Sequence, residues 1–351
     1  MKTKKKSRGK KGIKKFFITF VLLLIIGAVL ISIDFYHKVF TPYAGYGDTT
    51  TIIIKKGSSV SAIGRMLYRN KIISNYYYFR IYYRLFFNHL NFKTGEYEFD
   101  RPMTMKEVIQ KLYEGKVVLY KVTIKEGLII KEIAELLAKQ PSLNIDAQEF
   151  IHHARSTQLI QSLDPEAPDL EGYLFPDTYM VRKEITAEEM VELMVTRFKE
   201  NLSDSMRWRA DELKLSMRDV VTLASLIEKE TSAREERFLI SSVFHNRLRI
   251  GMALACDPTI IYALKRDNLY RDKLGWKELK YDSPYNTRLY RGLPPGPICN
   301  PGYYSIEAAL YPEKTKYLYF VAKDYRSHHF SETLREHNWA VRKYIINRNR
   351  N

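Results

Sequence analysis

The sequence predicts an α+β protein with three successive parts: a single transmembrane helix near the N-terminus, small strand-helix modules, and a larger mixed α+β domain. Three observations lead to this division. An uncharged apolar stretch comes first, a strand-turn-helix pattern then occurs twice, and later helices alternate with loops rich in proline and aromatic residues. A chain of 351 residues with 45% hydrophobic residues can build a core in at least one domain.

The first residues of the chain are strongly basic. The net charge is +17, and nine of the positive charges lie in residues 1–15, which contain no acidic residue. A basic tail can bind nucleic acid, but the segment that follows this one indicates a membrane instead. We therefore expect a cytoplasmic tail that faces anionic lipid headgroups, and no nucleic-acid partner.

Residues 16–33, from Phe16 to Ile33, contain no charged side chain. As a helix they would span roughly 27 Å, close to the thickness of the hydrocarbon core of a bilayer. A cleaved signal peptide is the alternative, but the stretch is long for one and no small-x-small cleavage pattern follows. Because lysine and arginine stay on the cytoplasmic side, we expect a single pass through the inner (cytoplasmic) membrane. Everything after Asp34 would then lie outside, on the periplasmic side.

Residues 34–49 are expected to be a linker, and residues 50–165 to form small modules. Within the segments that start near Ile52 and Lys121, Ile54 and Gly57 fall on Ile124 and Gly127, an offset of seventy residues. Each copy has a short β-branched strand, a glycine turn and apolar residues at helical spacing. Such a unit resembles the LysM-like fold of cell-wall proteins, although generic strand-helix modules would give the same pattern.

The two cysteines, Cys256 and Cys299, lie in the part predicted to be exported, where a disulfide could form. Two cysteines in a domain of this size do not make a disulfide framework, so we expect unpaired thiols and leave their pairing open. The eight histidines show no metal-ligand spacing with the cysteines or with one another. The sequence therefore predicts no metal and no cofactor.

Residues 166–347 form the predicted larger domain, and one of its helices should begin at Met217. Ser216 with Asp219 makes a capping box. The apolar face of this helix should be accompanied by a polar stripe of Thr222, Ser225 and Lys229. The apolar run ends abruptly in two glutamates, Glu228 and Glu230.

Glu228 and Glu230 lie about 200° apart on a helical wheel, so they cannot both point into one cleft. A glutamate at the margin of an apolar surface is partly desolvated, which raises its pKa towards the range that a general acid needs. Helix ends also carry glutamates with no catalytic role, however. The helical pattern alone neither establishes catalysis nor chooses between the two residues.

Other segments carry residues that suggest a site. Residues 171–181 interleave aromatic side chains with carboxylates, and Asp257 is the expected cap of a helix that continues with Pro258. Residues 283–302 hold five of the thirteen prolines and three of the sixteen glycines of the chain. Because proline fixes the backbone in advance, we expect this last segment to form a rigid wall beside a groove.

Seven motifs occur in order between about residue 50 and residue 344: "EGYLFPDTY", "ASLIEKET", "VFHNRL", "DPT", "SPYNT", "GLPPGPICNPG" and "FSETLREHN". Together they resemble the YceG-like family of endolytic murein transglycosylases. The resemblance implies a membrane-anchored enzyme that cuts nascent peptidoglycan glycan strands internally, beside the penicillin-binding proteins that synthesise them. Two residues depart from the family pattern, Cys256 before "DPT" and Arg326 before "SHHFS".

The resemblance also implies the catalytic residue, which in this family is the first glutamate of "EKET" and here is Glu228. A lytic transglycosylase uses the C6 hydroxyl of N-acetylmuramic acid as nucleophile, so one carboxyl group can act first as acid and then as base. The product is a 1,6-anhydro end, which terminates strand elongation. The alternatives are a hydrolytic muramidase, with Asp177 or Asp257 as the second carboxyl, and a non-catalytic wall-binding scaffold.

The remaining residues of the predicted site are expected to bind substrate. Aromatic rings could stack on sugars, with core packing as the alternative role, and polar side chains could bind acetamido or lactyl groups. Glu230 would support the catalytic helix end. The expected substrate-binding residues are Tyr173, Phe175, Asp177, Tyr179, Glu230, Asn246, Tyr285, Asn286 and Arg288.

Overall fold

The computed structural model describes residues 8–324 and 327–346, with side chains from residue 14 onwards. Three expectations fall partly outside these residues: the first seven residues of the basic tail, the turn at Arg326, and residue 347 at the end of the predicted larger domain. The chain divides into two compact units, with the boundary between Leu119 and Tyr120. Each unit is described by itself.

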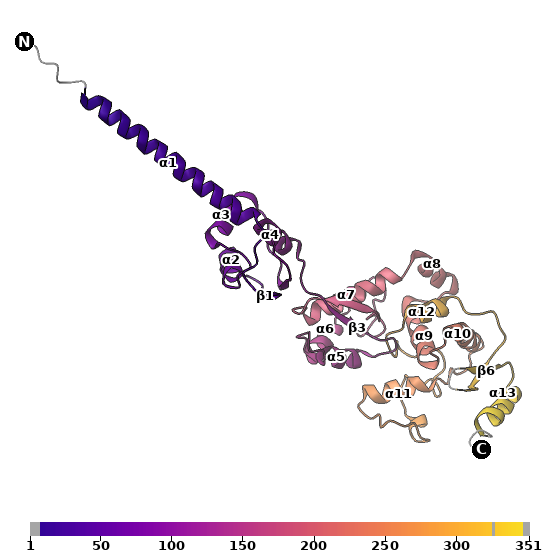
Figure 1. Cartoon of the computed structure of the whole chain (residues 1–351). Helices are drawn as coiled ribbons and strands as arrows, with labels where there is room; N and C mark the ends of the chain where they lie inside the picture. Colours follow the sequence, from indigo (N-terminus) through magenta and orange to yellow (C-terminus); the bar gives the residue numbers. More distant parts are fainter. Residues whose placement is uncertain (1–7, 325–326, 347–351) are drawn as a thin grey trace, which may run out of the picture. The chain divides into compact units, whose positions relative to one another are not determined.

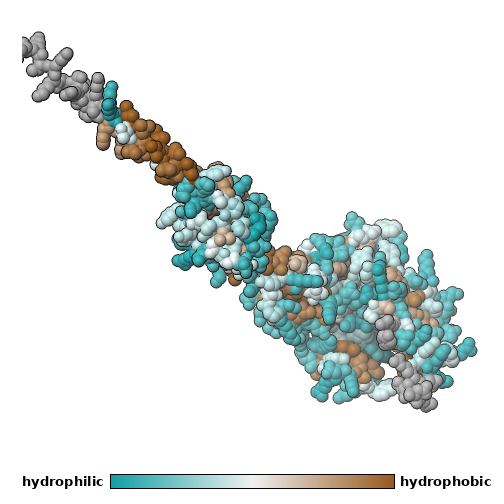
Figure 2. Space-filling view, viewed as in Figure 1, coloured by the Kyte–Doolittle hydropathy of each residue, from teal (hydrophilic) through white to brown (hydrophobic). Residues whose placement is uncertain are grey.

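The first unit begins with α1 (Arg8–Phe40), whose stretch Lys14–Phe40 is long and apolar enough to cross a membrane. Figure 2 shows an apolar surface along this helix. The helix runs further than expected, because residues 34–40, predicted as linker, are helical. They stay helical because they pack: the ring of Phe35 lies 5.3 Å from that of Tyr78, and Val39 is fully buried.

The rest of the first unit is a two-stranded antiparallel sheet with three helices. Strand β1 (Thr50–Ile54) pairs with β2 (Gly95–Phe99). The helices are α2 (Val60–Arg69), α3 (Tyr76–Phe86) and α4 (Met105–Glu114). The apolar core of this unit includes Ile52, Ile54, Ile63, Leu67, Phe79, Tyr97, Phe99, Val108, Ile109 and Leu112.

Both predicted strand-turn-helix units are present. In the first, Gly57 takes a φ of 81° between β1 and α2, a left-handed turn that favours glycine. In the second, Gly127 takes a φ of 77° between β3 (Tyr120–Thr123) and α5 (Ile130–Ala138). The likeness of these units to the LysM fold stays a prediction.

The second of these units belongs with the larger domain, so the compact units divide well before residue 165, where the sequence analysis places the boundary. The reason is strand pairing across the expected boundary. Strand β3 pairs in antiparallel fashion with β4 (Thr178–Val181), and α6 (Ala147–Ala154) packs against α7 (Ala187–Asn201). Segments on both sides of residue 165 therefore bury one common core.

The second unit is mainly helical, with β3 and β4 as one small sheet and β5 (Tyr319–Ala322) and β6 (His328–Ser331) as another. Helix α9 (Met217–Glu230) lies against four others, α8, α10, α11 and α12, whose labels surround it in Figure 1. The remaining elements are η1 (Thr157–Ile160), α8 (Asp204–Leu213), α10 (Arg234–Arg249), α11 (Asp257–Arg266), η2 (Glu278–Lys280), α12 (Tyr303–Leu310), α13 (Leu334–Val341) and η3 (Arg342–Ile346).

Helix α9 begins at Met217, as predicted, and its N-terminus carries the expected capping box of Ser216 and Asp219. The predicted polar stripe is wrong for Thr222 and Ser225, because residues 220–227 are all buried, whereas Lys229 is exposed. Ser225 accepts a hydrogen bond of 3.0 Å from the backbone nitrogen of Ile298. The end of the proline-rich segment thus covers the side of α9 that the sequence pattern left open to solvent.

Candidate active site

Near its C-terminal end, helix α9 carries a glutamate whose side chain is almost fully enclosed. Residues 220–227 are all buried, and the side chain of Glu228 in the next position is only 6% exposed. Burying a carboxylate without partners costs several kcal/mol. The partners of Glu228 therefore decide what this group can do.

Three donors from two other helices reach the carboxylate of Glu228. Oε2 accepts hydrogen bonds from the backbone nitrogen of Gly302, at 3.0 Å, and from Oγ of Ser305, at 2.8 Å. Gly302 is the residue that caps the N-terminus of α12, where backbone N–H groups have no partners within the helix, and Ser305 lies in the first turn of α12. Oε1 accepts a bond of 3.0 Å from Nη2 of Arg237, which lies on α10.

Arg237 connects Glu228 with a second carboxylate. The same Nη2 atom donates a bond of 3.1 Å to Oε2 of Glu126, which lies in the loop between β3 and α5. The side chain of Arg237 is 6% exposed, whereas that of Glu126 is 42% exposed. One buried guanidinium group thus lies between an enclosed carboxylate and a half-exposed one.

The loop that carries Glu126 is held by hydrogen bonds to its backbone. The backbone nitrogen of Gly127 donates to the carbonyl of Asn300 at 2.9 Å, and its carbonyl accepts a bond of 3.1 Å from Nζ of Lys229. The side chain of Asn300 is fully buried and donates to the carbonyl of Leu128 at 2.9 Å. The loop is therefore tied both to the end of α9 and to the segment that leads into α12.

These residues surround a pocket of about 480 Å³, with Glu126, Gly127, Glu228, Lys229, Thr231 and Arg237 on its walls. Burial raises the pKa of Glu228 above its ordinary value, while the charge of Arg237 and the hydrogen bonds from Ser305 and Gly302 lower it. Burial outweighs these opposing effects. The pocket can therefore offer a substrate a carboxyl group that keeps its proton at higher pH than an ordinary glutamate.

The carboxyl group of Glu230 points elsewhere, as the helical wheel predicts. It bonds to the thiol of Cys256, and burial raises its pKa. Glu230 borders the pocket of Glu228, but its carboxyl group is engaged on the other flank of α9. The structure places it as a helix-end residue.

Three of the aromatic residues expected to stack on sugars are core residues instead. Tyr173 is 1% exposed, and its hydroxyl donates to Asp164 at 2.8 Å. Phe175 and Tyr179 are also buried, and the hydroxyl of Tyr179 donates to the carbonyl of Phe175. The alternating aromatic pattern therefore reflects packing against the apolar core of the second unit.

Two expected substrate contacts are ion pairs away from the pocket. Asp177 accepts a bond of 2.6 Å from Nε of Arg197, and Arg288 donates one of 2.6 Å to Asp257. Asp257 is the first residue of α11 and not its cap, which is Cys256. Neither Asp177 nor Asp257 lies among the residues that line the pocket of Glu228.

The two expected asparagines fix loops to the fold. Nδ2 of Asn246 donates to the carbonyls of Thr315 and Tyr317, both at 3.0 Å. Asn286 is fully buried, and its Nδ2 donates to the carbonyl of Tyr281 at 2.8 Å. Both amides are thus occupied by backbone carbonyls.

The proline-rich segment contributes to the site only at its C-terminal end. Tyr285 is 6% exposed and packs on Tyr262 of α11, with ring centroids 5.0 Å apart. By contrast, Asn300 and Gly302 contact the Glu126 loop and Glu228. The C-terminal end of the predicted wall therefore supports the residues of the pocket, and Tyr285 belongs to the core.

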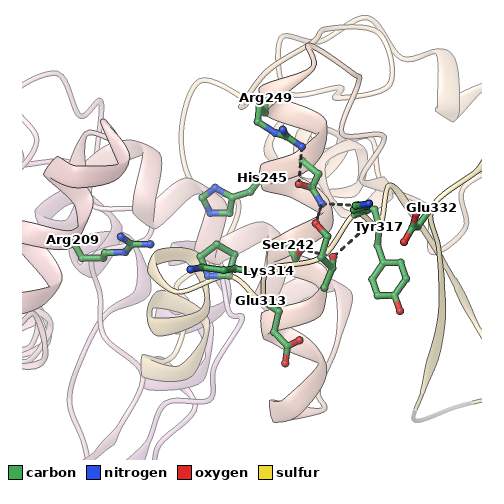
Figure 3. A pocket seen from close by; sticks show the side chains of 12 residues that line it. Arg209, Ser242, His245, Arg249, Glu313, Lys314, Tyr317 and Glu332 are labelled. Atoms are coloured by element: carbon green, nitrogen blue, oxygen red, sulfur yellow. Dashed lines mark hydrogen bonds between the residues drawn. The ribbon is translucent and has the colours of Figure 1, made fainter.

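A larger pocket of about 740 Å³ lies elsewhere in the second unit, and Figure 3 shows its lining. Arg209, Arg249 and Lys314 give it a basic character. Its two carboxylates, Glu313 and Glu332, are both exposed. Since neither is enclosed as Glu228 is, the smaller pocket is the better candidate for acid-base chemistry.

Four residues of the site were not predicted from the sequence: Glu126, Arg237, Gly302 and Ser305. Glu126 follows directly on the repeated strand, and Arg237 lies in a charged helix start with no motif of its own. Gly302 ends the proline-rich segment and Glu126 lies in the second strand-turn-helix repeat, but neither was assigned to the site. Nothing in the spacing could have joined residues so far apart in the chain.

Both cysteines are unpaired and buried. Among residues 8–324 and 327–346, no group of three or more histidine, cysteine, aspartate or glutamate side chains could hold a metal ion.

Residues 52–343 match the YceG-like family. The chain is 37% identical over 316 residues to an endolytic murein transglycosylase of Bacillus subtilis (strain 168), and the match covers 86% of each protein. It is 30% identical over 305 residues to an endolytic murein transglycosylase of Streptococcus pneumoniae (strain D39), covering 78% of this chain and 54% of that protein.

A solved structure also resembles this one. The crystal structure of a protein described as yceG-like, from Listeria monocytogenes, superposes with a TM-score of 0.56 at 37% sequence identity. The match covers 83% of this chain and 98% of that one. The family match includes both α9, which carries Glu228, and the loop that carries Glu126.

Proposed function

Since the chain belongs to the YceG-like family, we propose that it is an endolytic murein transglycosylase, a lyase that cuts peptidoglycan glycan strands internally. The bond cleaved is the β-1,4 bond from N-acetylmuramic acid to N-acetylglucosamine. The products carry 1,6-anhydro-N-acetylmuramic acid ends. Cleavage of nascent strands in this way terminates their elongation.

The observation that carries the proposal is the state of Glu228. A carboxyl group that is 6% exposed, has a raised pKa and borders a pocket can enter the reaction protonated. General acids work best when their pKa lies near the working pH. Burial at the end of α9 moves Glu228 in that direction.

In the proposed reaction Glu228 donates its proton to the glycosidic oxygen as the bond from C1 to that oxygen breaks. The C6 hydroxyl oxygen of the same muramic acid residue attacks C1, and its proton passes to Glu228. The carboxyl group ends in its starting state, and no water is consumed. Between the two transfers, Gly302 and Ser305 stabilise the carboxylate through hydrogen bonds to Oε2.

We further propose that α1 is a single membrane anchor with its basic end in the cytoplasm and the unit that carries Glu228 outside. Cytoplasmic lysines and arginines would meet anionic headgroups. Peptidoglycan synthases are the proposed protein partners, because an enzyme that terminates nascent strands must act where the strands emerge.

A hydrolytic muramidase is the second candidate, and Glu126 is the observation that favours it. Oε2 of Glu126 and Oε1 of Glu228 accept from the same nitrogen atom, so they lie within about 6 Å of each other. This agrees with glycosidases that use two carboxyl groups, which lie about 5 to 10 Å apart. Two facts weigh against this role: Glu126 is paired with Arg237, and it is 42% exposed. The products separate the two reactions, since hydrolysis gives reducing ends and transglycosylation gives anhydro ends.

The decisive experiment compares wild type with Glu228→Gln on uncrosslinked glycan strands, with mass spectrometry of the released ends. The amide keeps the shape of the side chain but has no proton to transfer, so we expect cleavage to fall below a tenth of wild type. Glu230→Gln is the matched control and should cleave. Residual activity of Glu228→Gln above a tenth would reject Glu228 as the acid, and wild type without cleavage would favour the wall-binding scaffold.

A further inference from the structure

Arg237 makes a contact that catalysis by Glu228 alone does not explain. A guanidinium group next to a carboxylate stabilises the ionised form of that carboxylate. A general acid, however, must be protonated when substrate arrives. An arginine bonded only to Glu228 would therefore work against the proposed chemistry.

Glu126 shares that arginine. Both carboxylates accept from Nη2 of Arg237, Glu126 at 3.1 Å and Glu228 at 3.0 Å. Each NH₂ group of a guanidinium has two hydrogens, so one nitrogen can serve both acceptors. The positive charge is thus divided between two carboxylates.

The surrounding backbone holds Glu126 in this place. Gly127 is fixed at its nitrogen by Asn300 and at its carbonyl by Lys229. Gly302 leaves room on the other side, because a Cβ at this position would overlap the carboxylate of Glu126. The contact with Arg237 is therefore built into the fold, although the side chain of Glu126 is half exposed.

In the described part of the chain, three elements supply the charged side chains that line the pocket of Glu228. Helix α10 supplies Arg237, the loop before α5 supplies Glu126, and α9 itself supplies Lys229 and Glu230. The nitrogen of Lys229 is bonded to the carbonyl of Gly127, and the carboxyl group of Glu230 faces Cys256. Helix α12 contributes only uncharged donors, from Gly302 and Ser305.

We propose that Glu126 is a positioning residue: by sharing Arg237 with Glu228, it neutralises the guanidinium beside the acid and allows Glu228 to hold its proton until substrate binds. Glu126 does not touch the reacting atoms in this role. It acts through Arg237, whose charge it balances. Coulombic repulsion from Glu126 also raises the pKa of Glu228, which agrees with the geometry.

This inference rests on the proposed role of Glu228 as general acid. Its test is Glu126→Gln, with Glu135→Gln as the matched control. Glu135 is an exposed glutamate on α5, the helix that follows the Glu126 loop, and its replacement removes the same charge. The full chain is used, with uncrosslinked glycan strands as substrate at concentrations well below KM.

The first measurement is the pH dependence of kcat/KM, which reports the pKa of the free enzyme's acid. Activity falls as pH rises and Glu228 loses its proton. Without Glu126 the full charge of Arg237 acts on Glu228, so this alkaline limb should move down by about one pH unit. At the acidic plateau the variant should stay within threefold of wild type, and Glu135→Gln should superpose on wild type throughout.

The second measurement is the titration of the Glu228 carboxyl carbon by NMR, which does not depend on activity. It should show the same downward shift in Glu126→Gln and none in Glu135→Gln. An unshifted limb and titration in Glu126→Gln would overturn the inference, as would equal loss of activity at every pH. Cleavage by Glu228→Gln would instead reject Glu228 as the acid, and wild type that forms no anhydro ends would reject the proposed function, so these failures are distinguishable from failure of the inference.

Discussion

The backbone nitrogen of Gly302 lies 3.0 Å from Oε2 of Glu228, which joins the first turn of α12 to the last turn of α9 through the candidate catalytic carboxylate. Gly302 has a φ of −78°, which any residue can adopt. The position needs glycine for space rather than for backbone conformation, because the carboxylate of Glu126 occupies the place of a Cβ.

The first prediction is therefore that Gly302→Ala folds but cleaves poorly. Its nitrogen can still donate to Glu228, but the new methyl group must push the carboxylate of Glu126 away from Arg237. Because that carboxylate ends a flexible side chain, it can move without disturbing the rest of the fold. The cleavage rate should fall by about tenfold, which corresponds to about 1.4 kcal/mol of activation free energy. The measurement is the cleavage rate at neutral pH together with the melting temperature.

Gly296→Ala is the control for this change. It lies in the same segment, and its Cβ would make an ordinary contact of 3.6 Å with the hydroxyl of Tyr285. It should leave the cleavage rate within twofold of wild type. Full activity of Gly302→Ala would show that Glu126 need not occupy its present place.

The sequence predicted those parts of this site that depend on local chemistry. The capping box of Ser216 and the apolar run fixed the start of α9 and placed Glu228 at its end, and two glycines correctly marked the strand-turn-helix units. The meeting of Glu126 with Glu228 depends on tertiary packing across about a hundred residues. No periodicity records such a contact.

The same limit explains the wrong assignments. Tyr173 and Tyr179 have apolar rings and one polar atom, and their sequence pattern fits a sugar platform as well as a core. The structure decides for the core because each hydroxyl finds a buried acceptor, Asp164 and the carbonyl of Phe175. Asn286 is likewise a polar residue whose partners are backbone groups of its own loop.

The second prediction concerns the pH dependence of stability. Burial raises the pKa of Glu228 in the folded state above its unfolded value, so the folded protein binds the proton more tightly. The corresponding stabilisation is fully present below the unfolded pKa, near 4.5, and is lost as pH rises through the folded pKa. Glu228→Gln carries no such proton.

We therefore expect the melting temperature of Glu228→Gln, relative to wild type, to increase between pH 4 and pH 8. The comparison is made by thermal unfolding of both proteins at each pH, with Glu135→Gln as a surface control that should show no trend. A difference that stays constant or reverses would mean that Arg237 and the start of α12 stabilise the carboxylate more than burial penalises it.

The third prediction concerns how much of α1 can be deleted without destabilising the first unit. Deleting residues 1–33 should give a soluble protein that still cleaves strands in solution, because Phe35 and Val39 remain to pack on the first unit. Deleting residues 1–40 removes both and should destabilise that unit by about 2 to 4 kcal/mol. Chemical unfolding of the two proteins measures the difference.

Equal stability of the two truncated proteins would show that residues 34–40 are a linker after all. Cleavage by the protein without residues 1–33 only when it is reattached to a membrane would show that the anchor takes part in catalysis. Either result would separate the packing role of the end of α1 from its role in placing the enzyme.

The last prediction concerns Pro294 and Pro295, in the segment expected to wall the groove. Pro294 is buried and Pro295 is exposed, while the part that contacts the site, from Ile298 onwards, is held by its own bonds to Ser225 and Leu128. Replacing both prolines with glycine increases the conformational entropy of the unfolded chain, which lowers the stability of the fold by about 1 to 2 kcal/mol. The melting temperature should therefore fall, while the folded fraction keeps its cleavage rate within threefold of wild type. A much larger loss of cleavage rate at an unchanged melting temperature would show that these prolines form part of the substrate groove. It would also mean that the rigid backbone they provide affects the position of Glu228 through Gly302.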